Sequence, residues 1–123
     1  MMYRFLSRIV FALFISFSTL AQTVTVKIIE TSDVHGAIFP YDLKENKEIN
    51  SSLARVTTYL KEQRADTNQI LFLLDNGDIL QGDPVVYYYN FEKTDTIHLY
   101  ADVMNFMKYD AGTVGNHDIE TGH

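Results

Sequence analysis

The fold class of this 123-residue chain is decided by a short stretch near its middle, Ile70-Leu71-Phe72-Leu73-Leu74-Asp75-Asn76-Gly77-Asp78. Its first five residues are apolar without interruption, which is typical of a strand covered on both faces of a sheet. The remaining residues are polar or glycine, so the apolar run ends directly at carboxylate side chains. The stretch therefore predicts a buried strand whose carboxyl end carries acidic groups.

Upstream of this strand, the sequence predicts another strand, a loop and a helix. Residues 23–30 mix alternation with β-branched residues and end at Thr31-Ser32-Asp33, as expected of a strand. Residues 37–50 carry mixed charges and a proline without periodicity, which indicates a surface loop. Residues 51–64 predict an amphipathic helix with Asn50, Ser51 or Ser52 as its N-cap; its apolar positions are Leu53, Val56, Tyr59 and Leu60.

Downstream, the sequence predicts further helices and a third strand. A turn at residues 81–84 leads into a candidate short helix through residues 87–89, and residues 90–96 are expected to form a polar loop. A second helix is expected over residues 97–108, with a buried stripe formed by Leu99, Val103, Phe106 and Met107. A short strand, residues 111–114, then ends at Gly115-Asn116-His117-Asp118.

The predicted order of elements is strand, helix, strand, helix, strand. This order favours an α/β fold, in which mainly parallel strands are joined by right-handed crossovers and flanked by helices. Ligands of such sheets bind beyond the carboxyl ends of the strands. All three polar clusters follow the ends of predicted strands, so we expect them to meet in one site.

The first 21 residues have the layout of a secretory signal peptide. Arg4 and Arg8 precede a twelve-residue apolar run, residues 9–20, and small residues lead to Ala21. That run is too short to span a bilayer, which takes roughly 20 residues as a helix. We expect cleavage after Ala21, export of the domain formed by residues 22–123 to the periplasm, cell surface or medium, and no stable membrane insertion.

Composition narrows the partners of this exported domain. The chain has no cysteine, so a core or bound metal rather than disulfides must hold it together. Its formal charge is −6, and loss of Arg4 and Arg8 with the signal peptide makes it −8. Such a charge argues against a nucleic-acid polymer as partner. A small phosphate ester can still bind where cations reverse the local field.

The polar clusters offer ligands for such cations. Asp33 and His35 stand two residues apart, and side chains at that spacing on an extended segment point the same way. Asp78 offers two carboxylate oxygens, one to each of two neighbouring ions, while Asn116 offers a neutral oxygen. Taken singly, each cluster is also compatible with ordinary turn chemistry. Together, oxygen and nitrogen ligands without thiolates favour manganese, magnesium or zinc over copper.

His117 is the candidate proton donor beside these ligands. Either Asp118 or Glu120 is placed to orient its ring and to favour the protonated form. His98 falls within a predicted helix, and we interpret it as structural.

As a set, these motifs resemble those of the calcineurin-like metallophosphoesterases, in particular the secreted branch of 5'-nucleotidases and 2',3'-cyclic-nucleotide phosphodiesterases. The resemblance covers the chain after Ala21 and rests on Thr31–Gly36, Leu74–Asp78 with Gln81-Gly82, Val114–Asp118 and the helical Leu53–Val56. It implies a layered metallophosphoesterase-type domain, of which this chain is the N-terminal portion.

The resemblance also implies roles for individual residues. Asp33 and His35 would hold the first of two divalent ions, Asp78 would bridge both, and Asn116 would hold the second. His117 would be the catalytic histidine, and Glu120 stands where the family usually has an acid, often Asp.

Family members add histidine ligands and a nucleoside-binding domain further downstream, beyond residue 123. The expected activity is therefore hydrolysis of nucleotides or other phosphate esters by a longer protein, with this portion alone inactive. The alternative is a non-catalytic remnant, or a module that binds metal or phosphate without turning it over.

Overall fold

The computed structural model describes Tyr3 and residues 23–120. The predicted signal peptide, residues 1–21, lies outside the described residues apart from Tyr3, and so do the last residues, 121–123. Within the described part, no helix is both long enough and apolar enough to cross a bilayer.

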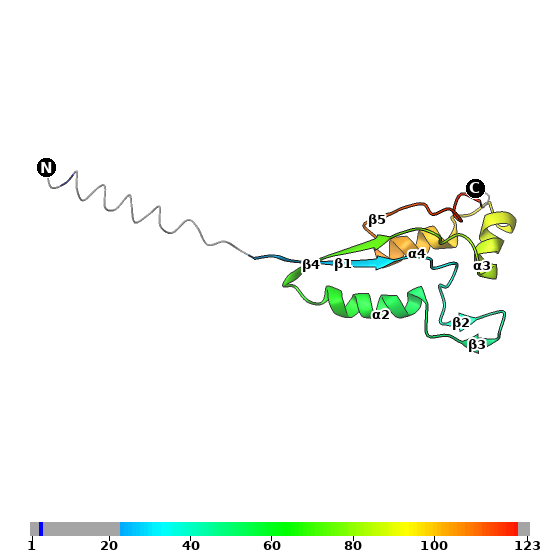
Figure 1. Cartoon of the computed structure of the whole chain (residues 1–123), viewed down its shortest axis with the longest axis horizontal. Helices are drawn as coiled ribbons and strands as arrows, with labels where there is room; N and C mark the ends of the chain where they lie inside the picture. The colour runs from blue at the N-terminus through cyan, green and yellow to red at the C-terminus, as the bar shows by residue number, and fades with distance from the viewer. Residues whose placement is uncertain (1–2, 4–22, 121–123) are drawn as a thin grey trace.

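A three-stranded parallel sheet forms the centre of the fold, and helices pack beside it (Figure 1). The sheet order is β1-β4-β5, and β2 and β3 form a separate antiparallel pair. The predicted α/β fold with mainly parallel strands and flanking helices is confirmed. In chain order the elements are β1 (Thr25–Thr31), β2 (Tyr41–Asp42), β3 (Lys47–Glu48), α2 (Leu53–Arg64), β4 (Gln69–Asp75), α3 (Pro84–Tyr87), the π-helix η1 (Tyr88–Glu92), α4 (Leu99–Met107) and β5 (Ala111–Gly112).

The strand register brings the three polar loops to one edge of the sheet. Thr31, the last residue of β1, pairs with Asp75, the last residue of β4, and Asp75 pairs with Gly112, the last residue of β5. Since the strands are parallel, the chain leaves all three at the same edge. The loops that carry the candidate site residues therefore start side by side.

Side-chain caps fix where the two longer helices begin. Ser52 is the N-cap of α2, because its hydroxyl accepts a hydrogen bond from the Arg55 N–H. His98 caps α4 in the same way: its Nδ1 accepts from the Tyr100 N–H at 3.1 Å. Helix α4 therefore begins at Leu99, two residues later than the periodicity predicted. His98 has a structural role as the cap of its N-terminus.

The core lies on one side of the sheet. Leu73 of β4 is fully buried in an apolar cluster with Leu60 of α2 and Met107 of α4, and Ile29 and Leu71 pack against that cluster. Both helices cover the same side, because the order β1-β4-β5 advances in one direction and right-handed crossovers then place their helices on a common face.

The opposite side of the sheet is apolar and exposed. Its side chains are Val26 (54% exposed), Ile28 (63%), Ile70 (50%) and Phe72 (41%), and the register pairs Val26 with Ile70 and Ile28 with Phe72. The prediction that the apolar run of β4 is covered on both faces is therefore wrong within the described part of the chain. The run is apolar on both faces, but α2 and α4 cover only one of them.

Several local predictions also need correction. The expected loop over residues 37–50 contains the β2–β3 hairpin, the expected loop from residue 90 begins inside η1, and β5 ends at Gly112 rather than at residue 114. Phe106 is 76% exposed instead of buried, since the inward face of α4 is formed by Tyr100, Val103, Met104 and Met107. Tyr59 of α2 is likewise 47% exposed.

Candidate metal centre

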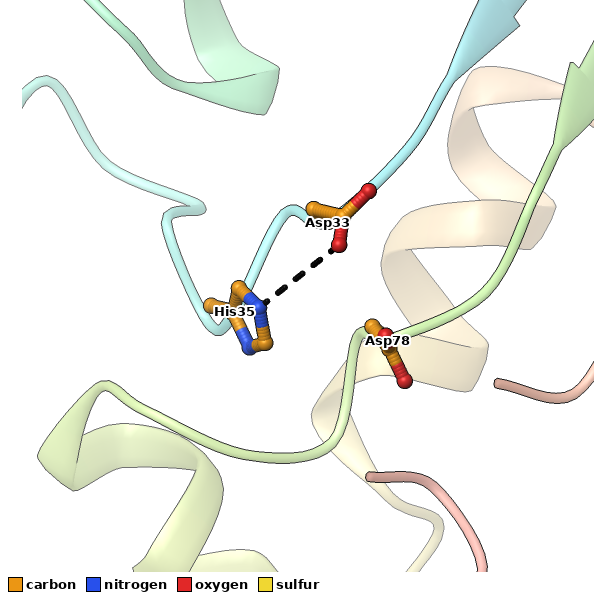
Figure 2. Close-up of side chains that lie close together, drawn as sticks. All are labelled: Asp33, His35 and Asp78. Carbon is orange, nitrogen blue, oxygen red and sulfur yellow. Dashed lines mark ion pairs between the residues drawn. The ribbon is translucent and has the colours of Figure 1, made fainter. Parts of the chain in front are cut away.

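Three candidate ligands converge where the loops after β1 and β4 meet. One ligand atom from each of Asp33, His35 and Asp78 lies within 4.8 Å of the others. Figure 2 shows the Asp33 carboxylate and the His35 ring on the first loop, with Asp78 on the second. His35 Nε2 is 3.9 Å from Asp33 Oδ1, a separation that lets both atoms face a common cation. Carboxylate and imidazole donors of this kind suit manganese, zinc or magnesium.

All three of these residues adopt a left-handed backbone conformation. Their φ angles are 53° at Asp33, 47° at His35 and 60° at Asp78. Non-glycine residues adopt such angles uncommonly, and strained backbone of this kind concentrates at functional sites. Left-handed backbone at both Asp33 and His35 thus brings these two side chains together. The extended segment that the sequence suggested for them is not what brings them together.

Backbone hydrogen bonds between the loops hold these conformations. The Asp33 N–H donates to the Gly77 carbonyl at 3.1 Å, and the His35 N–H donates to the Asp78 carbonyl at 3.0 Å. The candidate ligands on the β1 loop are therefore attached directly to the loop that carries Asp78.

The hydrogen bonding of His35 selects its metal-binding nitrogen. Nδ1 lies 3.1 Å from the carbonyl oxygen of Gln81. Because a carbonyl can only accept, Nδ1 is the donor in this contact, which leaves Nε2, the nitrogen nearer Asp33, as the one to bind a metal. A backbone carbonyl commonly fixes a metal-binding histidine in this way. This contribution of Gln81 could not be predicted from the sequence, because a backbone carbonyl leaves no signature in the residue type.

Glycines allow the loops to approach one another. A Cβ atom on Gly77 would lie 2.5 Å from the Gly115 nitrogen, and one on Gly115 would lie 2.1 Å from Asp78 Oδ1. A Cβ on Gly82, whose φ is +123°, would lie 2.6 Å from the His35 carbonyl oxygen. These three positions therefore require glycine for close packing around the candidate ligands.

The third loop brings His117 to the same place. Its ring centroid is 5.4 Å from that of His35, and its backbone N–H donates to Asp78 Oδ1 at 2.9 Å. His117 Nδ1 lies 3.2 Å from Glu120 Oε2, which in turn accepts from the Gln81 amide at 3.4 Å. Glu120 is therefore the acid whose carboxylate contacts the His117 ring in the structure.

Asp118 contacts the backbone of both loops. Its carboxylate accepts hydrogen bonds from four N–H groups, those of Asp78, Ile79, Leu80 and Gly115. Burial raises the pKa of Asp118, but the four donors together outweigh burial and hold the pKa below its ordinary value. Asn116, the remaining candidate ligand, is exposed on the same loop between Gly115 and His117.

Two buried side chains that are not candidate metal ligands, Asp75 and Asn90, hydrogen-bond to the backbone of the loop that carries Asp78. Asp75 is 3% exposed and accepts hydrogen bonds from the Thr31 hydroxyl at 2.8 Å and from the Gly77 N–H at 2.9 Å. The Asn90 amide donates to the Leu80 carbonyl at 2.7 Å. Thr31 and Asn90 lie on other elements than this loop, so their contribution could not be predicted from the sequence.

The sequence of this chain is similar to those of known phosphoesterases, although it matches no protein-family model. It is 38% identical over 109 residues to the trifunctional nucleotide phosphoesterase protein YfkN of Bacillus subtilis, covering 83% of this chain and 7% of that protein. It is 32% identical over 106 residues to the 2',3'-cyclic-nucleotide 2'-phosphodiesterase/3'-nucleotidase of Yersinia enterocolitica, covering 83% of this chain and 16% of that protein.

Solved structures give the same result. The crystal structure of the calcineurin-like phosphoesterase YfkN from Bacillus subtilis superposes with a TM-score of 0.70 at 36% identity, covering 80% of this chain and 31% of that one. A putative 5'-nucleotidase from Staphylococcus aureus superposes with a TM-score of 0.64 at 34% identity, covering 75% and 18%. The chain thus spans less than a third of either solved structure.

The parallel sheet, with its Asp and His side chains gathered at one edge, is that of a metallophosphoesterase. Within that class, the chain belongs to the calcineurin-like phosphoesterases as an N-terminal region, related to the 5'-nucleotidases and 2',3'-cyclic-nucleotide phosphodiesterases. The resemblance drawn from the sequence motifs is confirmed.

Proposed function

We propose that this chain supplies the first ligands of a two-metal centre in an exported phosphoesterase that hydrolyses nucleotides. The observation that carries the proposal is the convergence of Asp33, His35 and Asp78, each in a left-handed conformation, beside His117. Relatives whose names describe nucleotide phosphoesterases, nucleotidases and cyclic-nucleotide phosphodiesterases support this choice of substrate.

The residues present fit divalent cations. Asp33 and His35 would hold one ion, Asp78 would bridge two, and Asn116 would supply a neutral oxygen to the second. When bound, two such ions polarise a phosphate and lower the pKa of bound water. The site is open to solvent on the Asp33 side, since that side chain is 64% exposed, so a phosphate ester has access to it.

His117 would act on the leaving group. With Glu120 accepting from Nδ1, the ring is oriented and Nε2 is left to transfer a proton to the departing alkoxide oxygen. Since the Gln81 amide also contacts Glu120, the segment that fixes His35 also helps to place the acid that orients His117.

We further propose that residues 1–21 direct export and that residues 22–123 belong to the mature protein. The support is the sequence alone: two arginines before a twelve-residue apolar run and a small-residue end at Ala21. Cell fractionation combined with N-terminal sequencing tests this. The mature protein should be found outside the cytoplasm and begin at Gln22.

Metal-dependent phosphate release tests the main proposal. The protein translated from the complete reading frame that contains this chain should release phosphate from 5'-AMP and hydrolyse 2',3'-cyclic AMP in the presence of Mn²⁺, and a chelator should abolish both activities. Asp102→Asn, an exposed acid on α4, is the matched control and should behave as wild type. Tight Mn²⁺ binding without hydrolysis of any phosphate ester would favour the alternative, a non-catalytic metal-binding module.

A further inference from the structure

We infer that Asp118 is a positioning residue that joins the loops after β4 and β5 into one unit, so that Asp78 and His117 keep a fixed separation. The inference rests on the metal centre proposed above. It assigns to Asp118 a task different from orienting the His117 ring, which Glu120 contacts.

The four hydrogen bonds of Asp118 use both of its oxygens. Oδ1 accepts from the N–H groups of Ile79 and Leu80, each at 2.8 Å. Oδ2 accepts from Asp78 at 2.8 Å and from Gly115 at 2.9 Å. A carboxylate has about four acceptor positions, so all four of these N–H groups can bind it at once. Asn, the closest neutral residue in shape, offers one oxygen and keeps only one of the two pairs.

The loop after β4 needs an acceptor of this kind. Asp78 has a φ of 60°, so the chain turns sharply there, and three successive N–H groups at residues 78–80 point to Asp118 instead of to a strand or helix. Ile79 is 8% exposed, and a buried N–H without a partner costs about 1–3 kcal/mol. Asp118 thus stabilises the left-handed turn that directs the Asp78 carboxylate toward Asp33 and His35.

The same carboxylate reaches the other loop through Gly115. That contact holds the start of the β5 loop against the β4 loop, two residues before His117. Asp78 itself accepts from the His117 N–H through Oδ1. Because Asp118 ties the loops together independently of this bond, the Asp78 carboxylate keeps its other lone pairs for cations. A metal ligand and a proton donor on separate loops are then held in one geometry.

Asp118→Asn in the protein from the complete reading frame tests this role, with Asp110→Asn as the matched control. Asp110 also accepts a backbone hydrogen bond, from the Leu73 N–H at 2.8 Å, but it directly precedes β5, at the opposite end of that strand from the loop that carries His117. We expect Asp118→Asn to weaken Mn²⁺ binding by roughly 10- to 100-fold, as is typical when a partner of the metal ligands is removed. Asp110→Asn should leave the Mn²⁺ affinity within about twofold of the wild-type value.

Amide hydrogen exchange in the absence of metal reports on the loops directly. In Asp118→Asn, exchange should accelerate at the pair of N–H groups that loses its oxygen, either Ile79 and Leu80 or Asp78 and Gly115, and it should remain unchanged at all four in Asp110→Asn. Asp118→Glu, which retains two carboxylate oxygens, should recover part of the Mn²⁺ affinity and serves if Asp118→Asn does not fold.

The outcomes separate the two proposals. Wild-type protein that binds no Mn²⁺ overturns the metal centre and, with it, the consequence inferred for Asp118. Unchanged exchange at residues 78–80 in Asp118→Asn overturns the joining of the loops, whether or not metal binds. Accelerated exchange with unaltered Mn²⁺ affinity reduces Asp118 to a stabilising residue and overturns its positioning role.

Discussion

Replacing Gly115 by alanine should disable the metal centre through a single methyl group. The added Cβ would lie 2.1 Å from Asp78 Oδ1 and 2.6 Å from the Asp78 backbone nitrogen, whereas real Cβ atoms essentially never come closer than 3.0 Å. The Asp78 carboxylate oxygen and the Gly115 backbone must therefore move apart by at least 0.9 Å, the difference between 3.0 and 2.1 Å. A misplacement of about 1 Å at a catalytic site costs on the order of 10²-fold in rate.

The matched control is Gly112→Ala on β5, three residues earlier. Its added Cβ would meet its nearest neighbours at 3.6 Å, an ordinary contact. In the protein from the complete reading frame, Mn²⁺-dependent phosphate release should fall about 10²-fold for Gly115→Ala and stay near wild type for Gly112→Ala. Both variants should keep their far-UV circular dichroism. Wild-type turnover by Gly115→Ala would refute the close approach of the loops and the metal centre built on it.

Four further results are expected. Asp78→Asn should abolish most hydrolysis while the fold survives, because one bridging charge serves both ions; near-normal metal-dependent turnover would contradict that assignment. His117→Ala should retain its metal, as measured by elemental analysis, but lose about 10²- to 10⁴-fold in turnover; equal metal loss in both variants would mean that His117 is a ligand. Residues 22–123 expressed alone should bind Mn²⁺ weakly, lack nucleotidase activity and aggregate through the exposed face of β1 and β4; monomeric, metal-loaded and active protein would contradict this. The pKa of Asp118 is lower in the folded chain than the ordinary 3.8, so Asp118 stabilises the fold above that pH and this contribution is lost as the pH falls through the folded-state pKa. The free energy of unfolding of wild type should therefore decline more steeply on acidification than that of Asp118→Asn.

The elements of the fold could be predicted because their signals are local. Each signal spans only a few neighbouring residues: one is the uninterrupted apolar run at residues 70–74, and the other is the helical spacing of Leu53, Val56 and Leu60. The alternation of these elements then implied a parallel sheet. Errors arose where a residue's environment depends on distant segments: Phe72 is apolar but 41% exposed, because both helices pack on the other face.

At the candidate site, too, the local signals could be predicted and the long-range contacts could not. Asp33, His35 and Asp78 could be singled out because each stands in a polar cluster just after a strand. The contacts that support them could not, because these join residues about 40 positions apart. His35 Nδ1 meets the Gln81 carbonyl, and Asp118 meets the backbone of residues 78–80. Such partners are brought together only by the packing of one loop on another.

By itself, the sequence determined which residue types stand at the end of each strand, and so the chemistry that this edge of the sheet can support. The tertiary structure decided how those residues are used. Residue type alone left Asp118 and Glu120 as equal candidates to orient His117, and the folded loops separate them. Glu120 contacts the imidazole, while Asp118 accepts four backbone N–H groups. The physical reason is that a carboxylate bonds whichever donors the fold places within about 3 Å of it, and those positions are set by the packing of all three loops.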